Sequence, residues 1–127
     1  MNLQLIIAVA LGGAIGSVTR YGVGIGSGKL FGLAFPWGTL IINIVGSFLI
    51  GAFAESFALR WDAPQAVRMF LTVGICGGFT TFSTFSLDAY VLLERAEWWQ
   101  AAAYMIGSVV LSIGGLVAGL HLMRAAL

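Results

Sequence analysis

The sequence predicts an all-α integral membrane protein with four transmembrane helices, and three observations support this prediction. Hydrophobic residues make up 60% of the chain and charged residues only 9%, whereas a soluble domain averages about 25% charged residues. The alternation over about ten residues that marks a transmembrane β-strand is not visible. The charges leave four uncharged stretches, each about as long as a membrane-spanning helix: residues 1–19, 30–54, 69–87 and 98–123.

The first helix is predicted at about residues 3–19. Gly12 and Gly16 are spaced i,i+4 and form a face of small residues suited to close helix packing. A glycine-rich segment follows, with glycine at positions 22, 24, 26, 28 and 32. This density favours a loop or a frayed extension over a lipid-facing helix. A cleavable signal peptide is an alternative for the first stretch, although no Lys or Arg precedes its apolar run.

The remaining helices complete a single domain, residues 1–127, and are predicted at about residues 36–59, 65–93 and 98–123. Pro36 falls in the first turn of the second helix, where its missing N–H costs nothing. Pro64 opens the third helix, and we expect an interruption of that helix near Gly77–Phe79. Trp98 and Trp99 begin the fourth helix and are placed for the headgroup region.

The basic residues are divided equally between the two sides of the membrane that four spans define. One side holds Arg60, Arg68 and Arg124, and the other holds Arg20, Lys29 and Arg95. Orientation normally follows an excess of Lys and Arg in cytoplasmic loops. The tie is either chance in a chain with few charges, or it indicates that both orientations are used in an antiparallel, dual-topology homodimer. Such a dimer is the two-chain form of the inverted repeat found within many transporters.

The sequence contains no constellation typical of an enzyme. His121, the only histidine, lies near the end of the fourth helix, and no nucleophile has a neighbouring base. The single cysteine, Cys76, excludes an internal disulfide and a cysteine-based metal site. A net charge of +1 gives no indication of nucleic-acid binding. The carboxylates fall at or beyond the span ends: Glu55, Asp62, Asp88, Glu94 and Glu97.

Polar residues within the spans are more informative. Asn43 lies well inside the second helix, where a carboxamide is costly unless it finds a partner. It could bond a neighbouring helix, or it could donate to an anion in a pore, since its amide offers two N–H donors. Tyr104, Ser108 and Ser112 are spaced i, i+4 and i+8 and form one hydroxyl stripe on the fourth helix. These hydroxyls could bond back to a helix, or could replace part of an ion's water shell.

The stretch GICGGFTTFSTFS, residues 74–86, interrupts the third helix with glycines and hydroxyls. In a membrane, a break in helical hydrogen bonding survives only inside protein or beside water. Freed carbonyls at a break can hold a cation, and helix N-termini attract anions. The segment therefore favours an ion site over a lipid-facing helix. Arg20, expected at the end of the first helix, either snorkels to the headgroups or attracts anions at a vestibule.

Three motifs together resemble the Fluc fluoride channels, also called the CrcB family: GGAIGSVTRY (12–21), GTLIINIVGSFLIG (38–51) and GICGGFTTFSTFS (74–86). The resemblance covers nearly the whole chain. It implies a fluoride-selective channel in the bacterial cytoplasmic (inner) membrane, which passes fluoride passively down its electrochemical gradient and almost excludes chloride. It also implies an antiparallel homodimer with two pores.

The resemblance further implies roles for individual residues. The pore would be lined by Asn43, Phe82, Phe85, Tyr104, Ser108 and Ser112. The phenylalanines would form an aromatic box, the asparagine would donate to fluoride, and the residues of the fourth helix would form a polar track. Arg20 would match the family's arginine after the first helix. Backbone carbonyls of Gly77 and Thr80 from both chains would hold a structural sodium ion at the dimer centre.

Two other functions compete with the channel. A proton-coupled small multidrug exporter would also be short, with about four spans, but proton coupling needs an ionisable group inside the membrane. The uncharged stretches contain no Asp or Glu, and Glu55 at the end of the second helix is the nearest candidate. A non-transporting assembly subunit would use the same glycine faces, but it has little reason to line the third helix with hydroxyls.

Overall fold

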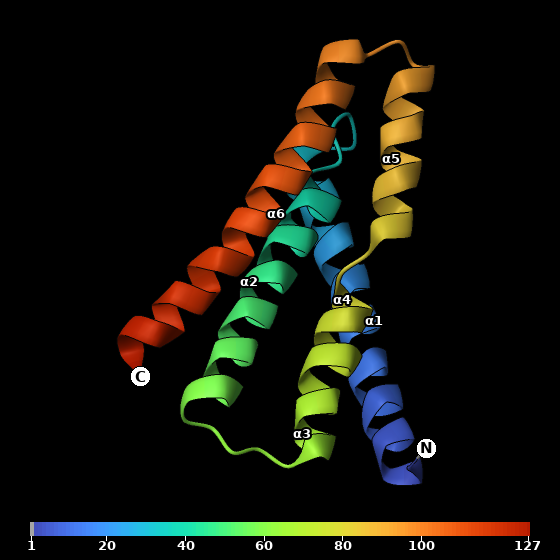
Figure 1. Ribbon diagram of the computed structural model, residues 1–127. Helices are drawn as coiled ribbons and strands as arrows, with labels where there is room; N and C mark the ends of the chain where they lie inside the picture. The colour runs from blue at the N-terminus through green and yellow to red at the C-terminus, as the bar shows by residue number, and fades with distance from the viewer. Residues whose placement is uncertain (1) are drawn as a thin grey trace.

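The computed structural model describes residues 2–127, and within this range every regular element is helical. The elements are α1 (Leu3–Phe31), α2 (Trp37–Leu59), α3 (Gln65–Met69), the π-helical η1 (Phe70–Cys76), α4 (Gly77–Phe79), α5 (Phe82–Glu94) and α6 (Trp98–Ala126) (Figure 1). Because α3, η1, α4 and α5 follow one another as a single span, the described chain has four helices long and apolar enough to cross a membrane. The predicted all-α class, with four helices able to span a membrane, is confirmed.

The prediction that the first helix ends near residue 19 was wrong, because α1 continues to Phe31. The glycines of this extension favour a loop in water, but in a membrane a helix satisfies its backbone groups internally. They also allow close packing: a Cβ atom built on Gly38 of α2 would lie 3.4 Å from Gly24 Cα and 3.4 Å from Ser27 Cβ. The helix ends at Gly32, whose φ of 78° favours glycine.

The third span is broken, as predicted, but the break lies just after the expected residues. Gly77–Phe79 remain helical as α4, whereas Thr80 and Thr81 are extended, with φ and ψ of −80° and 157° and of −154° and 121°. Thr81 caps the following helix, because its Oγ1 accepts a hydrogen bond from the Thr84 N–H at 3.2 Å. The hydroxyl residues therefore form the break, and the glycines precede it.

Close glycine contacts hold α1 against the first half of the third span, as the small-residue face of α1 predicted. A Cβ atom on Gly12 would collide with the carbonyl oxygen of Phe70, and one on Gly16 would collide with that of Ile75. The same device joins α2 to α6, where a Cβ atom on Gly51 would collide with the Leu116 carbonyl oxygen. Each contact requires the absence of a side chain.

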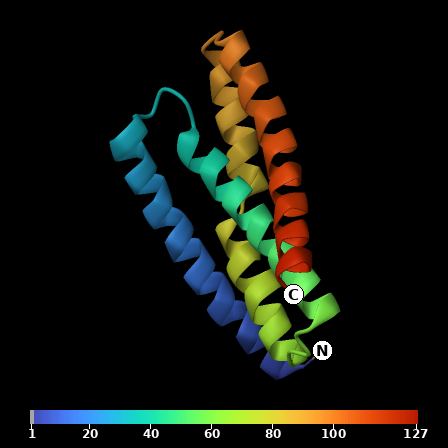
Figure 2. The same ribbon diagram turned by 90° about the vertical axis from the view of Figure 1, so that its left-hand side faces the viewer.

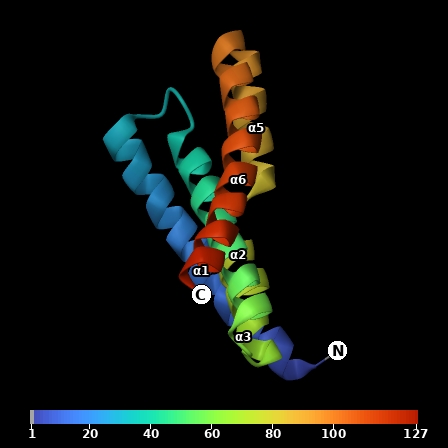
Figure 3. The same cartoon turned by 60° about the vertical axis from the view of Figure 1, so that its left-hand side comes forward.

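The fold consists of two helix pairs that meet at the break. α2 and α6 lie side by side, and α1 runs against α3, η1 and α4 (Figures 1 and 2). After the break, the third span turns away from α1 and continues as α5 beside α6 (Figure 3). The extended residues between α4 and α5 are thus placed next to α2, near the middle of the molecule (Figure 1).

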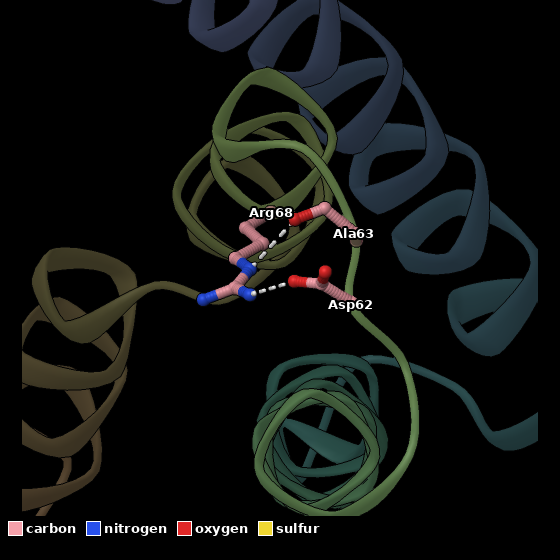
Figure 4. Close-up of polar contacts among 3 residues, drawn as sticks. All are labelled: Asp62, Ala63 and Arg68. Atoms are coloured by element: carbon pink, nitrogen blue, oxygen red, sulfur yellow. Dashed lines mark hydrogen bonds and ion pairs between the residues drawn. The ribbon is translucent and has the colours of Figure 1, made fainter.

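Arg68 closes the loop between α2 and α3 (Figure 4). Its Nε donates to the Ala63 carbonyl at 3.0 Å, and its Nη2 lies 3.6 Å from Asp62 Oδ1. Its guanidinium also lies 5.6 Å from the centre of the Phe57 ring. The ion pair is exposed and adds little stability, so the carbonyl bond and the ring contact do most to fix the turn.

Candidate functional site

A cavity of about 320 Å³ lies between α2, the break, α5 and α6. It is lined by Asn43, Ser47, Thr80, Thr81, Phe82, Phe85, Ser108, Val109, Ser112 and Ile113. All the residues predicted to line a pore except Tyr104 are brought together here. No charged side chain lines this cavity among the described residues, and six of its ten lining residues carry a hydroxyl or amide group.

Asn43 joins α2 to the break through two hydrogen bonds to one residue. Its Oδ1 accepts from the Thr81 N–H at 2.8 Å, and its Nδ2 donates to the Thr81 carbonyl at 3.1 Å. The amide therefore bonds a neighbouring segment, which was one of the two alternatives. Because the Nδ2 group carries two hydrogens, one of them remains for an acceptor in the cavity, so the donor role is compatible with the same geometry.

The hydrogen bonds at the break divert the donors that would satisfy two carbonyl groups. In a continuous helix, the Gly77 carbonyl would accept from the Thr81 N–H and the Thr80 carbonyl from the Thr84 N–H. Here the Thr81 N–H bonds Asn43 Oδ1 and the Thr84 N–H bonds Thr81 Oγ1. The helical donors to the Gly77 and Thr80 carbonyls, the two groups for which the family resemblance implied a cation, are thus bonded elsewhere.

Arg20 was expected at the end of the first helix, but it lies inside α1 and contacts the break. Its Nε donates to the Gly78 carbonyl at 3.1 Å. The guanidinium is thus at the C-terminal end of α4, where the helix dipole is negative. This contact disfavours the snorkelling position, which was one of the two alternatives for Arg20.

A second cavity, of about 670 Å³, lies between α1, the loop after it, α2 and α5. Arg20, Lys29 and Asp88 line it, together with the uncharged Thr84. Thr81 lines both cavities and is therefore the residue at which they approach each other. Arg20 faces a hollow, as the vestibule hypothesis requires.

Tyr104 lies behind the smaller cavity and is fully buried. Its ring centroid is 5.1 Å from that of Phe85, and its hydroxyl donates to Asp88 Oδ2 at 3.0 Å. Sequence reasoning missed Asp88, because this carboxylate was assigned to a span end. Its position three residues after Phe85, on the same face of a helix, is the feature that could have connected it with the pore residues.

The two predicted box phenylalanines lie together, with ring centroids 5.5 Å apart and an angle of 46° between the rings. Phe85 is partly buried against Tyr104, whereas Phe82 is 78% exposed. One chain therefore supplies an incomplete wall on the Phe82 side of the cavity.

Ser108 and Ser112 present buried hydroxyl groups that have no hydrogen-bond partner among the described residues. Ser56, by contrast, bonds back to the Ala52 carbonyl at 2.8 Å, which is the common solution for serine in a membrane helix. A buried hydroxyl without a partner costs about 1–3 kcal/mol. These two residues therefore suit a site where the hydrogen-bond partner of the hydroxyl is a mobile ion or water molecule.

The remaining titratable candidates lie outside both cavities. Glu55 is buried, and its Oε2 pairs with Arg124 Nη2 at 3.1 Å, between α2 and the last turn of α6. His121 is exposed on α6.

Comparison with known proteins relates this arrangement to one family. The family described as CrcB-like protein, Camphor Resistance (CrcB), matches residues 7–120. A relative from Nitrobacter winogradskyi named "Fluoride-specific ion channel FluC" is 65% identical over 124 residues, 98% of each chain. "Fluoride-specific ion channel FluC 1" of Nitrobacter hamburgensis is 64% identical over the same share. A FluC protein of Rhizobium johnstonii is 55% identical over 119 residues, 94% of this chain and 95% of the relative.

Proposed function

The chain belongs to the CrcB-like protein family, and on this premise we propose that it is a fluoride-selective ion channel. It passes fluoride passively down its electrochemical gradient, out of the bacterial cytoplasm and across the inner membrane. The observation that carries the proposal is the uncharged cavity between α2, the break, α5 and α6, whose apolar wall is interrupted by hydroxyl and amide groups. A channel has no catalytic group, and we assign none.

The lining of the cavity suits a small anion. An aromatic ring has a positive edge, so Phe82 and Phe85 can meet an anion without a formal charge. Fluoride holds its water strongly, so a path must offer replacement donors at each step. The spare N–H of Asn43 and the partnerless hydroxyls of Ser108 and Ser112 are such donors. Because these groups are neutral, binding stays weak enough to permit exit.

A second, antiparallel copy of the chain completes the pore in this proposal. Phe82 is 78% exposed, and the Gly77 and Thr80 carbonyls have lost their helical donors. A membrane does not tolerate open backbone groups facing lipid, so a second chain would cover this part of the span. The near balance of basic residues between the two sides gives little bias toward one orientation. Two such chains would form two equivalent pores.

The proposed dimer centre also holds a structural sodium ion. The carbonyls of Gly77 and Thr80, whose helical donors are diverted to Asn43 and Thr81, fit this role because hard cations prefer oxygen ligands. A bound sodium ion would supply positive potential near the pores.

Arg20 would act at a vestibule for anions. The larger cavity that it lines with Lys29 reaches Thr81, which also borders the pore cavity. Positive charge in a low-dielectric hollow raises the local concentration of anions. Asp88 opposes part of this potential, and its bond to Tyr104 holds the tyrosine beside Phe85.

The multidrug-exporter alternative is disfavoured by the environment of Glu55. Proton coupling would need a carboxylate on the substrate path. Glu55 is instead paired with Arg124 at the ends of α2 and α6, away from both cavities.

Ion efflux from liposomes tests the proposal. Purified protein is reconstituted, a potassium ionophore clamps the voltage, and fluoride and chloride release are recorded with ion-selective electrodes. We expect rapid fluoride release and little chloride release. Equal rates for the two ions would remove the selectivity claim, and no release of either ion would remove the channel.

A further inference from the structure

Ser47 lies one helical turn after Asn43 on α2, and it lines the same cavity. Residues spaced i,i+4 project from the same helix face. The wall that α2 contributes therefore has two polar positions, as does the wall that α6 contributes through Ser108 and Ser112. Nothing in the polar pattern of the sequence had marked Ser47, because a lone serine in an apolar helix is ordinary.

The neighbours of α2 approach it closely at the level of Ser47. A Cβ atom on Gly46 would collide with Thr80 Cγ2, so the break packs directly against the residue before Ser47. On α6, a Cβ atom on Gly115 would lie 3.1 Å from the Ile44 carbonyl oxygen and 3.9 Å from the Phe48 nitrogen. Ser47 is thus held between the two elements that complete the cavity wall, the break and α6.

The hydroxyl residues in the spans differ in whether their side chains bond back to their own helix. Several of these bond back to the carbonyl four residues earlier: Thr19, Ser56, Thr72, Thr80 and Ser86. Ser47 makes no such bond, nor any side-chain hydrogen bond to another described residue. It shares this property with Ser108 and Ser112, the hydroxyls on the opposite wall. Its hydroxyl is therefore available to the contents of the cavity.

We propose that Ser47 is a further pore-lining residue, which donates a hydrogen bond to the permeating fluoride in the step beside Asn43. This inference rests on the proposed channel function. It adds a donor on α2 facing the polar track of α6, so that the ion is held from both sides. Loss of one hydrogen bond to a charged group corresponds to roughly a tenfold change or more in rate.

The test compares two serines on the same helix. Ser47→Ala is expected to lower fluoride efflux from liposomes by about tenfold or more. Ser56→Ala is the matched control, because the Ser56 hydroxyl is occupied by the Ala52 carbonyl, and it should conduct like the unaltered protein. Ser47→Ala with unaltered efflux would overturn the proposal. Absence of efflux in the unaltered protein would overturn the channel function itself, which keeps the two failures distinct.

Two single-cysteine variants test separately whether Ser47→Ala acts on the pore and not on folding. Ser47→Cys and Ser56→Cys are made in a Cys76→Ala background, which removes the chain's single, buried cysteine. A small, negatively charged thiol reagent is expected to block efflux through Ser47→Cys and to leave Ser56→Cys unaffected. If both variants conduct and neither is blocked, Ser47 does not face the pore.

Discussion

The substitution Asn43→Ala tests how the break is held. It removes both hydrogen bonds between the side chain and Thr81, at 2.8 Å and 3.1 Å, and leaves the Thr81 N–H and carbonyl without these partners inside a membrane span. An unsatisfied buried polar group costs about 1–3 kcal/mol, while hydrogen bonds within membrane proteins average about 0.6 kcal/mol. The penalties for the two unsatisfied Thr81 groups add up to about 2–6 kcal/mol. Because hydrogen bonds in membrane proteins are weak, we expect a loss of stability near the lower end, about 2 kcal/mol.

The same substitution should also suppress fluoride efflux, because it removes the donor that faces the cavity. The two readouts are chemical unfolding in detergent and efflux from liposomes, with gel filtration to confirm that the assembly persists. Val45→Ala is the control, since Val45 is on the same helix but exposed. If Asn43→Ala unfolds like the unaltered protein and conducts normally, Asn43 neither holds the break nor donates to the ion.

Two further predictions rest on individual contacts, and a third on the proposed dual topology. Gly16→Ala should cost about 1–3 kcal/mol of stability through overpacking, because its Cβ atom would meet the Ile75 carbonyl. Gly13→Ala is the control, since its Cβ atom would lie in open space, and it should unfold like the unaltered protein. Equal stabilities of the two variants in chemical unfolding would contradict the packing of α1 on η1. Tyr104→Phe keeps the ring beside Phe85 but loses the hydrogen bond to Asp88. Fluoride efflux should therefore fall about tenfold, while the free energy of unfolding changes by less than about 1.5 kcal/mol. Unchanged efflux would show that this hydroxyl is not needed. Cysteines placed in the α5–α6 loop and labelled from each side of the membrane should be found in both orientations, and labelling from one side alone would refute dual topology.

The membrane class could be predicted from the sequence because it depends on local composition. The spacing of charges defined the spans, and the glycines and hydroxyls of residues 74–86 indicated a broken helix, although the break was placed at Gly77–Phe79, just before the extended Thr80 and Thr81. The cavity could be anticipated in part, because residues spaced i,i+4, such as Ser108 and Ser112, share a helix face.

The remaining features depend on contacts between distant segments. The length of α1 was underestimated, because glycine propensity describes a helix in water and the packing of Gly24 against Gly38 is not visible in a local window. The contact of Arg20 with the Gly78 carbonyl and that of Asn43 with Thr81 join residues far apart in the chain. No local pattern specifies such partners.

The most direct test of whether the ion passes through the cavity beside the break is a comparison of fluoride efflux. The Phe82→Ile variant and the unaltered protein are reconstituted at the same protein-to-lipid ratio. Isoleucine keeps an apolar side chain but lacks the ring edge that meets the anion. We predict that the unaltered protein releases fluoride rapidly, and that Phe82→Ile releases it at least about tenfold more slowly while it remains assembled on gel filtration. Equal fluoride release from the two proteins would contradict the account.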